Sequence, residues 1–129
     1  MRFLLDTHTF LWLVSDSPEL SSQAREWMVD PNSELMLSSV VATELAIKTG
    51  IGKLRLARPV SEFVDLYASE YGLTHWPLNF EEAARLENLP LHHRDPFDRL
   101  LIAQAIHHDV PILTRDPVFK QYACEIRWD

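Results

Sequence analysis

Four acidic residues occupy positions where an isolated negative charge is costly unless something binds it. Two follow short apolar runs and two lie inside apolar helical patterns: Asp6, Asp116, Glu44 and Asp98. Carboxylates that share a pocket repel one another, and they take up protons or hold a cation. A set of oxygen ligands suits Mg²⁺ or Mn²⁺ better than Zn²⁺. Such an ion can align water and stabilise the charge on a phosphodiester, which predicts metal-dependent hydrolysis.

Three of these acids also have simpler explanations. Asp6 and Asp116 could serve only as helix N-caps, a role that Asp often fills. Asp98 lies in the first turn of a helix opened by Pro96, where a negative charge favours the helix dipole. Asp95 competes with Asp98 as a ligand, but its place before Pro96 indicates a cap.

Glu44 is the hardest of the four to explain by local structure. It falls at helical spacing with Val40, Ile47 and Ile51, which predicts that it shares the inward face of its helix. The alternative is a surface ion pair with Lys48 four residues later. That alternative does not explain the apolar residues at the same spacing.

Strand and helix signals alternate along the whole chain. Short apolar runs predict strands at Arg2–Leu5, Leu35–Leu37, Leu73–Trp76, Val110–Leu113 and Glu125–Trp128. Capping and periodicity predict intervening helices that start near Asp6, Ser21, Val40, Pro59, Asn79, Pro96 and Pro117. This alternation predicts an α/β fold with a central parallel sheet of four to five strands covered on both faces. At 129 residues, we expect one domain over residues 1–129.

The expected sheet would bring the acids together. Ligands of open parallel sheets bind beyond the carboxyl ends of the strands, so Asp6 and Asp116 can meet if their strands are neighbours. Asp98, Leu101 and Ala105 repeat at helical spacing, which turns Asp98 inward as well.

The charge balance limits the partners. Twelve Lys and Arg against nineteen Asp and Glu give a net charge of -7, which argues against binding nucleic acid by charge alone. Residues 45–61 contain no acid and hold four basic residues, which form either a nucleic-acid strip or a solvated loop: Lys48, Lys53, Arg55 and Arg58. We find no membrane-spanning run and no signal peptide, and we expect a cytoplasmic protein.

The histidines and aromatics offer weaker signals. The pairs His92–His93 and His107–His108 match no zinc spacing, and we expect solvated loop and helix-end positions for most histidines. His8, two residues after Asp6, could reach the edge of the acidic site. The aromatic residues of one helix could stack bases or pack in the core: Phe63, Tyr67 and Tyr71.

Four segments together resemble the PIN-domain family, specifically the VapC-type toxins of bacterial toxin–antitoxin pairs. They are Leu4–Trp12 (LLDTHTFLW), Ser38–Lys48 (SSVVATELAIK), Asp95–Ala105 (DPFDRLLIAQA) and Leu113–Asp116 (LTRD). Each motif is moderately specific alone, but their order and intervals extend the resemblance over nearly the whole chain.

The resemblance implies a three-layer α/β/α sandwich and a Mg²⁺- or Mn²⁺-dependent ribonuclease. The acidic quartet would be Asp6, Glu44, Asp98 and Asp116, with Thr7 and Thr114 orienting a carboxylate or a water molecule. It also implies a homodimer held inactive by a cognate antitoxin, whose C-terminal segment covers the site. Arg99 and Arg115, which flank two of the acids, either contact RNA phosphate or point into solvent.

Two other functions remain open from the sequence. A phosphatase of the haloacid dehalogenase kind would use Asp6 as nucleophile, but it would need a second Asp where His8 stands. A regulatory module would bind Mg²⁺ through the same acids without cleaving RNA.

Overall fold

A parallel sheet forms the centre of the molecule. The computed structural model describes residues 1–129 and contains five strands in the order β3-β2-β1-β4-β5, all parallel. Their bounds are β1 Arg2–Leu5, β2 Glu34–Ser38, β3 Thr74–Trp76, β4 Ile112–Leu113 and β5 Ile126–Arg127. Every predicted strand is present, and the expected α/β fold with a covered parallel sheet is confirmed.

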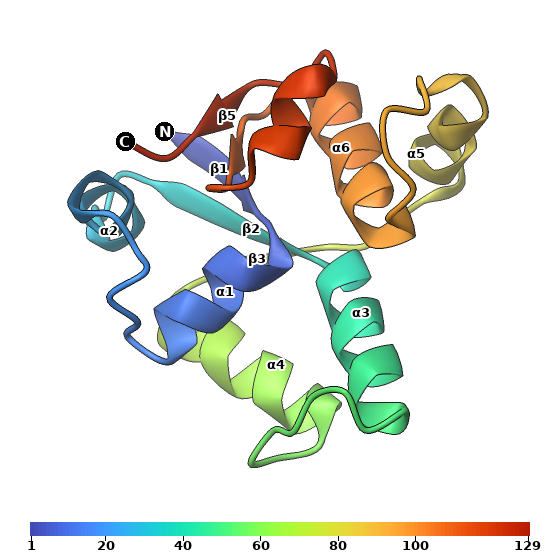
Figure 1. The fold of residues 1–129 in the computed structure, drawn as a ribbon. Coiled ribbons are helices and arrows are strands. Elements are labelled where there is room, and N and C mark those ends of the chain that lie inside the picture. The colour runs from blue at the N-terminus through green and yellow to red at the C-terminus, as the bar shows by residue number, and fades with distance from the viewer.

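Helices cover both faces of this sheet (Figure 1). On one side lie α1, Thr7–Val14, α2, Ser22–Val29, and α4, Val60–Glu70. On the other side lie α3, Ser39–Gly50, and α6, Pro96–His108, with α5, Phe80–Ala84, packed on α6. Two short 3₁₀ helices follow α5 and β4, at Arg85–Asn88 (η1) and Pro117–Gln121 (η2). The result is three layers, helix on sheet on helix.

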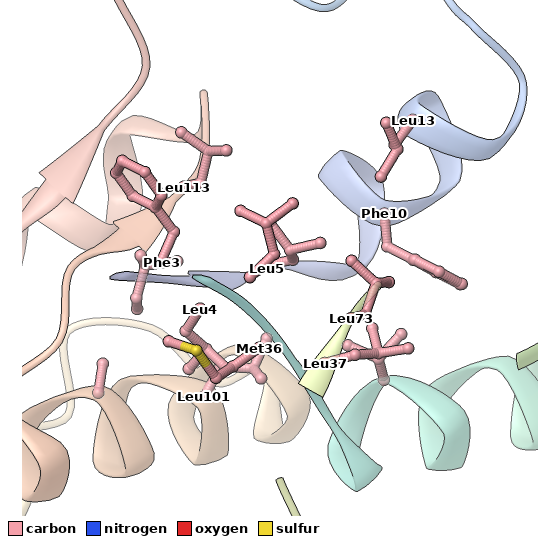
Figure 2. Packing of buried hydrophobic residues seen from close by; sticks show 14 of the residues in the cluster. Phe3, Leu4, Leu5, Phe10, Leu13, Met36, Leu37, Leu73, Leu101 and Leu113 are labelled. Atoms are coloured by element: carbon pink, nitrogen blue, oxygen red, sulfur yellow. The ribbon is translucent and has the colours of Figure 1, made fainter. Parts of the chain in front are cut away.

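The central strand β1 is buried from both sides, which explains its continuous apolar sequence. Phe3, Leu4 and Leu5 are each 0% exposed. Successive side chains point to opposite faces, so Leu4 packs with Met36 and Leu101 toward α6, whereas Phe3 and Leu5 point toward the α1 side (Figure 2). This core fixes β1 and therefore the position of Asp6 at its end.

The apolar face predicted for α3 is only partly correct. Val40 and Glu44 are buried as predicted, but Ile47 and Ile51 are 47% and 62% exposed, and the other buried residues of the helix are Val41 and Leu45. The C-terminal end of α3 projects away from the sheet (Figure 1), so apolar residues there find no core to enter. Burial of Glu44 therefore depends on the first two turns of the helix.

The aromatic residues of α4 mainly pack. Phe63 is buried with its ring edge-on to Phe10, at a centroid distance of 6.0 Å, and Tyr67 packs on Phe63 at 4.9 Å. The packing alternative is correct for Phe63 and Tyr67, whereas Tyr71 is 36% exposed. None of the helices combines the length and apolar character that crossing a bilayer would require.

Candidate active site

The strand order reverses beside β1. The chain passes from β1 to β2 and β3 on one side, then returns to place β4 and β5 on the other. In open parallel sheets, the crevice at such a reversal is where ligands bind. Asp6 follows β1, and Thr114 and Asp116 follow β4, at this same edge.

Asp6 is the N-cap of α1, as the simpler explanation required, and it is also buried. Its Oδ1 accepts the backbone N–H of Thr9 at 2.8 Å, and its Oδ2 accepts the hydroxyl of Thr114 at 2.5 Å. Asp6 is only 5% exposed. This burial raises the pKa of Asp6, although the two hydrogen bonds oppose the rise. Capping therefore leaves the charge of Asp6 incompletely compensated.

Thr114 joins Asp6 to Asp116. Its hydroxyl donates to Asp6 and accepts the backbone N–H of Asp116 at 3.1 Å. Asp116 is the N-cap of η2, with Oδ1 accepting the N–H of Val118 at 3.0 Å. Asp6 and Asp116 line one pocket of about 300 Å³. These two acids therefore meet at the sheet edge, where the strand order predicted them.

Glu44 reaches the same edge from α3. The hydroxyl of Thr7 donates to its Oε1 at 2.6 Å, and Lys48 Nζ lies 2.5 Å from its Oε2. The predicted i,i+4 ion pair therefore forms, but not on the surface, because the Glu44 side chain is only 6% exposed. Thr7 follows Asp6 directly, so α1 and α3 are tied together beside both acids.

Asp98 lies in the first turn of α6, where Asp95 is the N-cap, as expected. Burial, followed by the charge of Asp95, raises the pKa of Asp98 to about 6, and the charge of Asp6 adds to this rise. His93 Nε2 lies 3.2 Å from Asp98 Oδ2 and favours the ionised form. The influence of Asp6 on Asp98 means that the two carboxylates lie within electrostatic reach.

Lys48 connects Glu44 to the same region. Its hydrogen bond with Glu44 raises the pKa of Lys48, and the charges of Asp95 and Asp98 add to this increase. The Lys48 side chain is 38% exposed. Lys48 therefore responds to the charges of Glu44 and Asp98, and Asp98 responds to the charge of Asp6.

The donor set matches the chemistry of a hard divalent ion. It offers only oxygen ligands, and two of its carboxylates, Asp6 and Asp98, have raised pKa values that a bound cation would lower again. No three of the four acids have ligand oxygens within 4.8 Å of one another. Mg²⁺ keeps several of its waters in proteins, so acids at this spacing would hold it partly through water and partly directly.

One group of ligand-type atoms does lie within 4.8 Å, and it lies elsewhere: Glu82, His107 and His108. His108 follows Asp98 by ten residues on α6, which corresponds to about 15 Å along the helix. Glu82 Oε1 contacts His108 Nε2 at 2.5 Å, while Oε2 accepts the N–H of Asn79 and the amide of Gln104. The expectation of solvated helix-end histidines missed these contacts.

The arginine predicted beside Asp98 is engaged within the protein. Arg99 donates to the carbonyl oxygens of Pro90 and Leu89 and to the hydroxyl of Tyr122. The same hydroxyl contacts His93 Nδ1 at 2.7 Å. Arg99 therefore holds the loop that carries His93, and these internal hydrogen bonds occupy its guanidinium group. Sequence reasoning missed Tyr122, which lies far from Asp98 along the chain.

Arg115 and His8 both reach the pocket of Asp6 and Asp116, together with Trp12. Trp12 was not singled out from the sequence, although it follows His8 by four residues on α1 and so shares its face. Of the other basic candidates, Lys53 is exposed, and Arg55 lines a separate pocket of about 370 Å³ that contains none of the four acids.

A model of a known protein family matches the sequence of this chain, and several solved structures share its fold. The sequence model of the PIN domain matches residues 3–124. A chain of VapBC2 from Rickettsia felis, bound to a DNA fragment from its promoter, superposes with a TM-score of 0.74 at 19% identity, covering 100% of both chains. DNA-bound VapBC from Salmonella typhimurium gives 0.71 at 15% identity, covering 98% of this chain and 97% of that one.

VapBC-1 from nontypeable Haemophilus influenzae gives a TM-score of 0.69 at 18% identity, with 98% and 97% covered. No curated protein sequence matches the chain. At these low identities the solved structures establish only the fold. The match to the family model covers nearly the whole chain and establishes the family. The chain therefore belongs to the PIN-domain family, a family of nucleases.

Proposed function

We propose that the protein is a Mg²⁺-dependent endoribonuclease and the toxin of a type II toxin–antitoxin pair. The observation that carries this proposal is the convergence of acids at the strand-order reversal, where Asp6 and Asp116 share a pocket and Asp98 has a raised pKa. Membership of a nuclease family and the fold shared with chains of VapBC complexes support it.

In this proposal Asp6, Glu44, Asp98 and Asp116 hold the divalent ion. When bound, Mg²⁺ or Mn²⁺ would supply Lewis-acid stabilisation of charge on the phosphodiester and a means of activating water.

The surrounding side chains prepare these four acids. The hydroxyls of Thr7 and Thr114 fix one oxygen of Glu44 and one of Asp6 by hydrogen bonds. His93 orients Asp98, and Lys48 offsets part of the charge of Glu44. Such supporting contacts keep ligands in place and tune their affinity for an ion.

The RNA backbone would approach along the rim of the site. The Lys48 side chain is partly open to solvent, and Arg115, whose side chain is about half exposed beside Asp116, would contact the RNA without a fixed phosphate partner. Lys53 and Arg55, on the loop after α3, could guide more distant phosphates. The net charge of -7 means that phosphate binding depends on these local cations and on the metal.

A cognate antitoxin and a second copy of the chain are the protein partners in this proposal. The similar chains come from VapBC complexes, some bound to DNA. A basic side chain of an antitoxin would find complementary charge at the acidic pocket. A small neighbouring gene that encodes a DNA-binding start and an extended tail would support this pairing.

The two alternatives make different predictions. A phosphatase of the haloacid dehalogenase kind would need a second acid at the position of His8, which points into the pocket as an imidazole. A regulatory module would bind Mg²⁺ without turnover.

Incubation of the purified protein with end-labelled RNA separates the three functions. We expect cleavage in Mn²⁺ or Mg²⁺ that stops with EDTA and is absent in Asp98→Asn. Hydrolysis of a phosphate monoester with no RNA cleavage would support the phosphatase. Metal binding without either reaction would support the regulatory module.

A further inference from the structure

The residues that line the pocket beside Asp6 are of two chemical kinds. Asp6 and Asp116 contribute carboxylates, and His8, Trp12 and Arg115 contribute planar rings and a planar cation, which we call the planar wall. The proposed metal chemistry does not require the planar wall. The pocket has a volume of about 300 Å³ and includes two of the proposed metal ligands in its lining.

The planar wall is held in place before any ligand arrives. The guanidinium carbon of Arg115 lies 4.6 Å from the ring centroid of Trp12, and Glu19 forms an ion pair with the same guanidinium. Trp128 packs edge-on to Trp12 at 5.9 Å. A guanidinium fixed on an indole ring and by a carboxylate loses little freedom on binding a further planar group.

His8 extends this wall toward solvent. It is exposed and lies one turn before Trp12 on α1, with ring centroids 5.7 Å apart and planes inclined by 38°. The buried side chains of α1 are on other positions, including Phe10 and Leu13. His8 and Trp12 therefore contribute to the pocket more than to the core.

We propose that this pocket takes one unpaired nucleobase of the RNA, next to the phosphate that is cleaved, stacked against the layer formed by Arg115 and Trp12. The inference rests on the proposed ribonuclease activity and adds the part of the substrate that this pocket reads. Single-stranded RNA is recognised by stacking unpaired bases on aromatic side chains and on guanidinium planes.

The charges favour a base over a second phosphate. Arg115 is already paired with Glu19, and the four proposed ligand acids outnumber the two charges of one divalent ion, so a second phosphate in the pocket would meet net negative charge. A neutral base gains the stacking contact without that repulsion. A base inside a duplex cannot reach the pocket, because it remains stacked on its neighbours.

Short RNA oligonucleotides test this inference. One series is intact, and a matched series carries an abasic ribose on either side of the cleaved phosphate. We expect wild-type kcat/KM to fall about 5- to 100-fold for one of the two abasic positions, the range that loss of one stacked base produces. Binding of both series in Ca²⁺, followed by fluorescence anisotropy, gives a second readout that needs no turnover.

The variants Arg115→Lys and Trp12→Phe then show whether the pocket wall is responsible. Arg115→Lys keeps the charge but removes the planar fork, and we expect it to weaken the intact oligonucleotide strongly and the abasic one little. Trp12→Phe retains a smaller ring and should give an intermediate loss. Thermal unfolding of each variant separates folding defects from loss of the subsite.

The chain supplies a matched control in a second arginine–tryptophan pair. The guanidinium carbon of Arg2 lies 5.5 Å from the Trp76 ring centroid, and Arg2 pairs with Glu34, with exposures close to those of Arg115 and Glu19. Neither residue lines the acidic pocket. We expect Arg2→Lys to leave both the cleavage and the binding of intact and abasic oligonucleotides unchanged.

Three results would overturn the inference. In the first, intact and abasic oligonucleotides bind and react equally. In the second, Arg115→Lys weakens both series by the same factor, which would mean a backbone contact. In the third, Arg115→Lys changes only the affinity for a protein inhibitor, which would assign the pocket to a protein partner. If wild-type protein cleaves no RNA, the proposed function fails, and binding of an intact single-stranded oligonucleotide in Ca²⁺ by wild type, Arg115→Lys and Arg2→Lys then decides whether the pocket holds RNA.

Discussion

Two regions of this molecule contain buried carboxylates, and the surroundings shift the pKa of these carboxylates in opposite directions. At the junction of α5 and α6, Glu82 is 1% exposed. Burial raises its pKa, but hydrogen bonds from the backbone of Asn79, from His108 and from Gln104 outweigh burial, and the pKa of Glu82 is lowered overall. At the sheet edge, the pKa values of Asp6 and Asp98 are raised.

The difference separates a structural acid from a candidate ligand. The protein itself compensates Glu82, which completes the capping box of α5 with Asn79. The protein compensates Asp6 and Asp98 incompletely and places further acids beside them, which leaves a negative region that a cation would stabilise. Burial of a carboxylate alone is therefore a poor guide to function, and the balance of its partners is a better one.

Removing one acid of the sheet edge should have the largest effect on activity. Because Asp6→Asn and Asp98→Asn each remove a proposed ligand charge, we expect RNA cleavage to fall by about 1,000-fold or more. Expression of either variant should no longer arrest growth, and circular dichroism should show the fold retained. The exposed Asp65 on α4 supplies a control, since Asp65→Asn changes the same charge far from the proposed ligands. Retained toxicity in both ligand variants would contradict the mechanism.

Removing the acid of the other region should affect stability instead. Glu82→Ala leaves Gln104, His108 and the N–H of Asn79 without their acceptor, and we expect the free energy of unfolding to fall by about 2–4 kcal/mol. Urea denaturation measures this loss. RNA cleavage below the unfolding midpoint should be unchanged, and exposed Glu81→Ala should change neither quantity. Loss of cleavage at full folding would place Glu82 in the active site and break the comparison.

The raised pKa of Asp98 predicts a pH dependence of stability. The pKa of Asp98 in the folded state is about 6 and its ordinary pKa is 3.8, so the folded state binds more protons between these two pH values. Stability in EDTA should therefore fall as pH rises from about 4 to 6, by about 1–2 kcal/mol after allowance for partial solvation. Asp98→Asn should remove the part of this slope that Asp98 contributes and leave the part due to Asp6. With Mg²⁺ present, wild-type stability at pH 7 should recover. A flat wild-type profile in EDTA would show that Asp98 is already compensated.

Replacing a threonine at the sheet edge should lower activity less than replacing one of the acids. Thr114→Val removes the donor to Asp6 and the acceptor for the Asp116 N–H, and we expect about a tenfold loss in kcat/KM. Thr9 supplies a comparison, because its hydroxyl donates to the carbonyl of Leu113 at 2.8 Å, although its side chain also helps to lower the pKa of Asp6. Thr9→Val should cost about 1 kcal/mol of stability with little change in cleavage. Equal losses of activity in both variants would indicate a general packing effect.

Much of the fold could be predicted from local patterns. The runs Phe3–Leu5 and Leu35–Leu37 are buried strands because both faces of the sheet are covered, and Asp95–Pro96 opens α6 as its sequence indicates. The failure at Ile47 and Ile51 has a physical reason. Periodicity gives the phase of a helix but not how far the sheet extends beneath it.

The candidate site could be predicted only in part. Parallel strand ends and helical phase indicated a common edge for the acids. They could not show that Thr7 bonds Glu44, that Tyr122 supports His93, or that Glu19 holds Arg115 on Trp12. These contacts join residues that are far apart in the chain or on irregular loops, where no local spacing specifies them.

The most direct test of the central claim is diffraction from crystals grown with Mn²⁺, using its anomalous signal to locate the ion. We predict a peak among Asp6, Glu44, Asp98 and Asp116, lost in crystals of Asp98→Asn. A peak only beside Glu82, His107 and His108, or none at saturating Mn²⁺, would contradict the account.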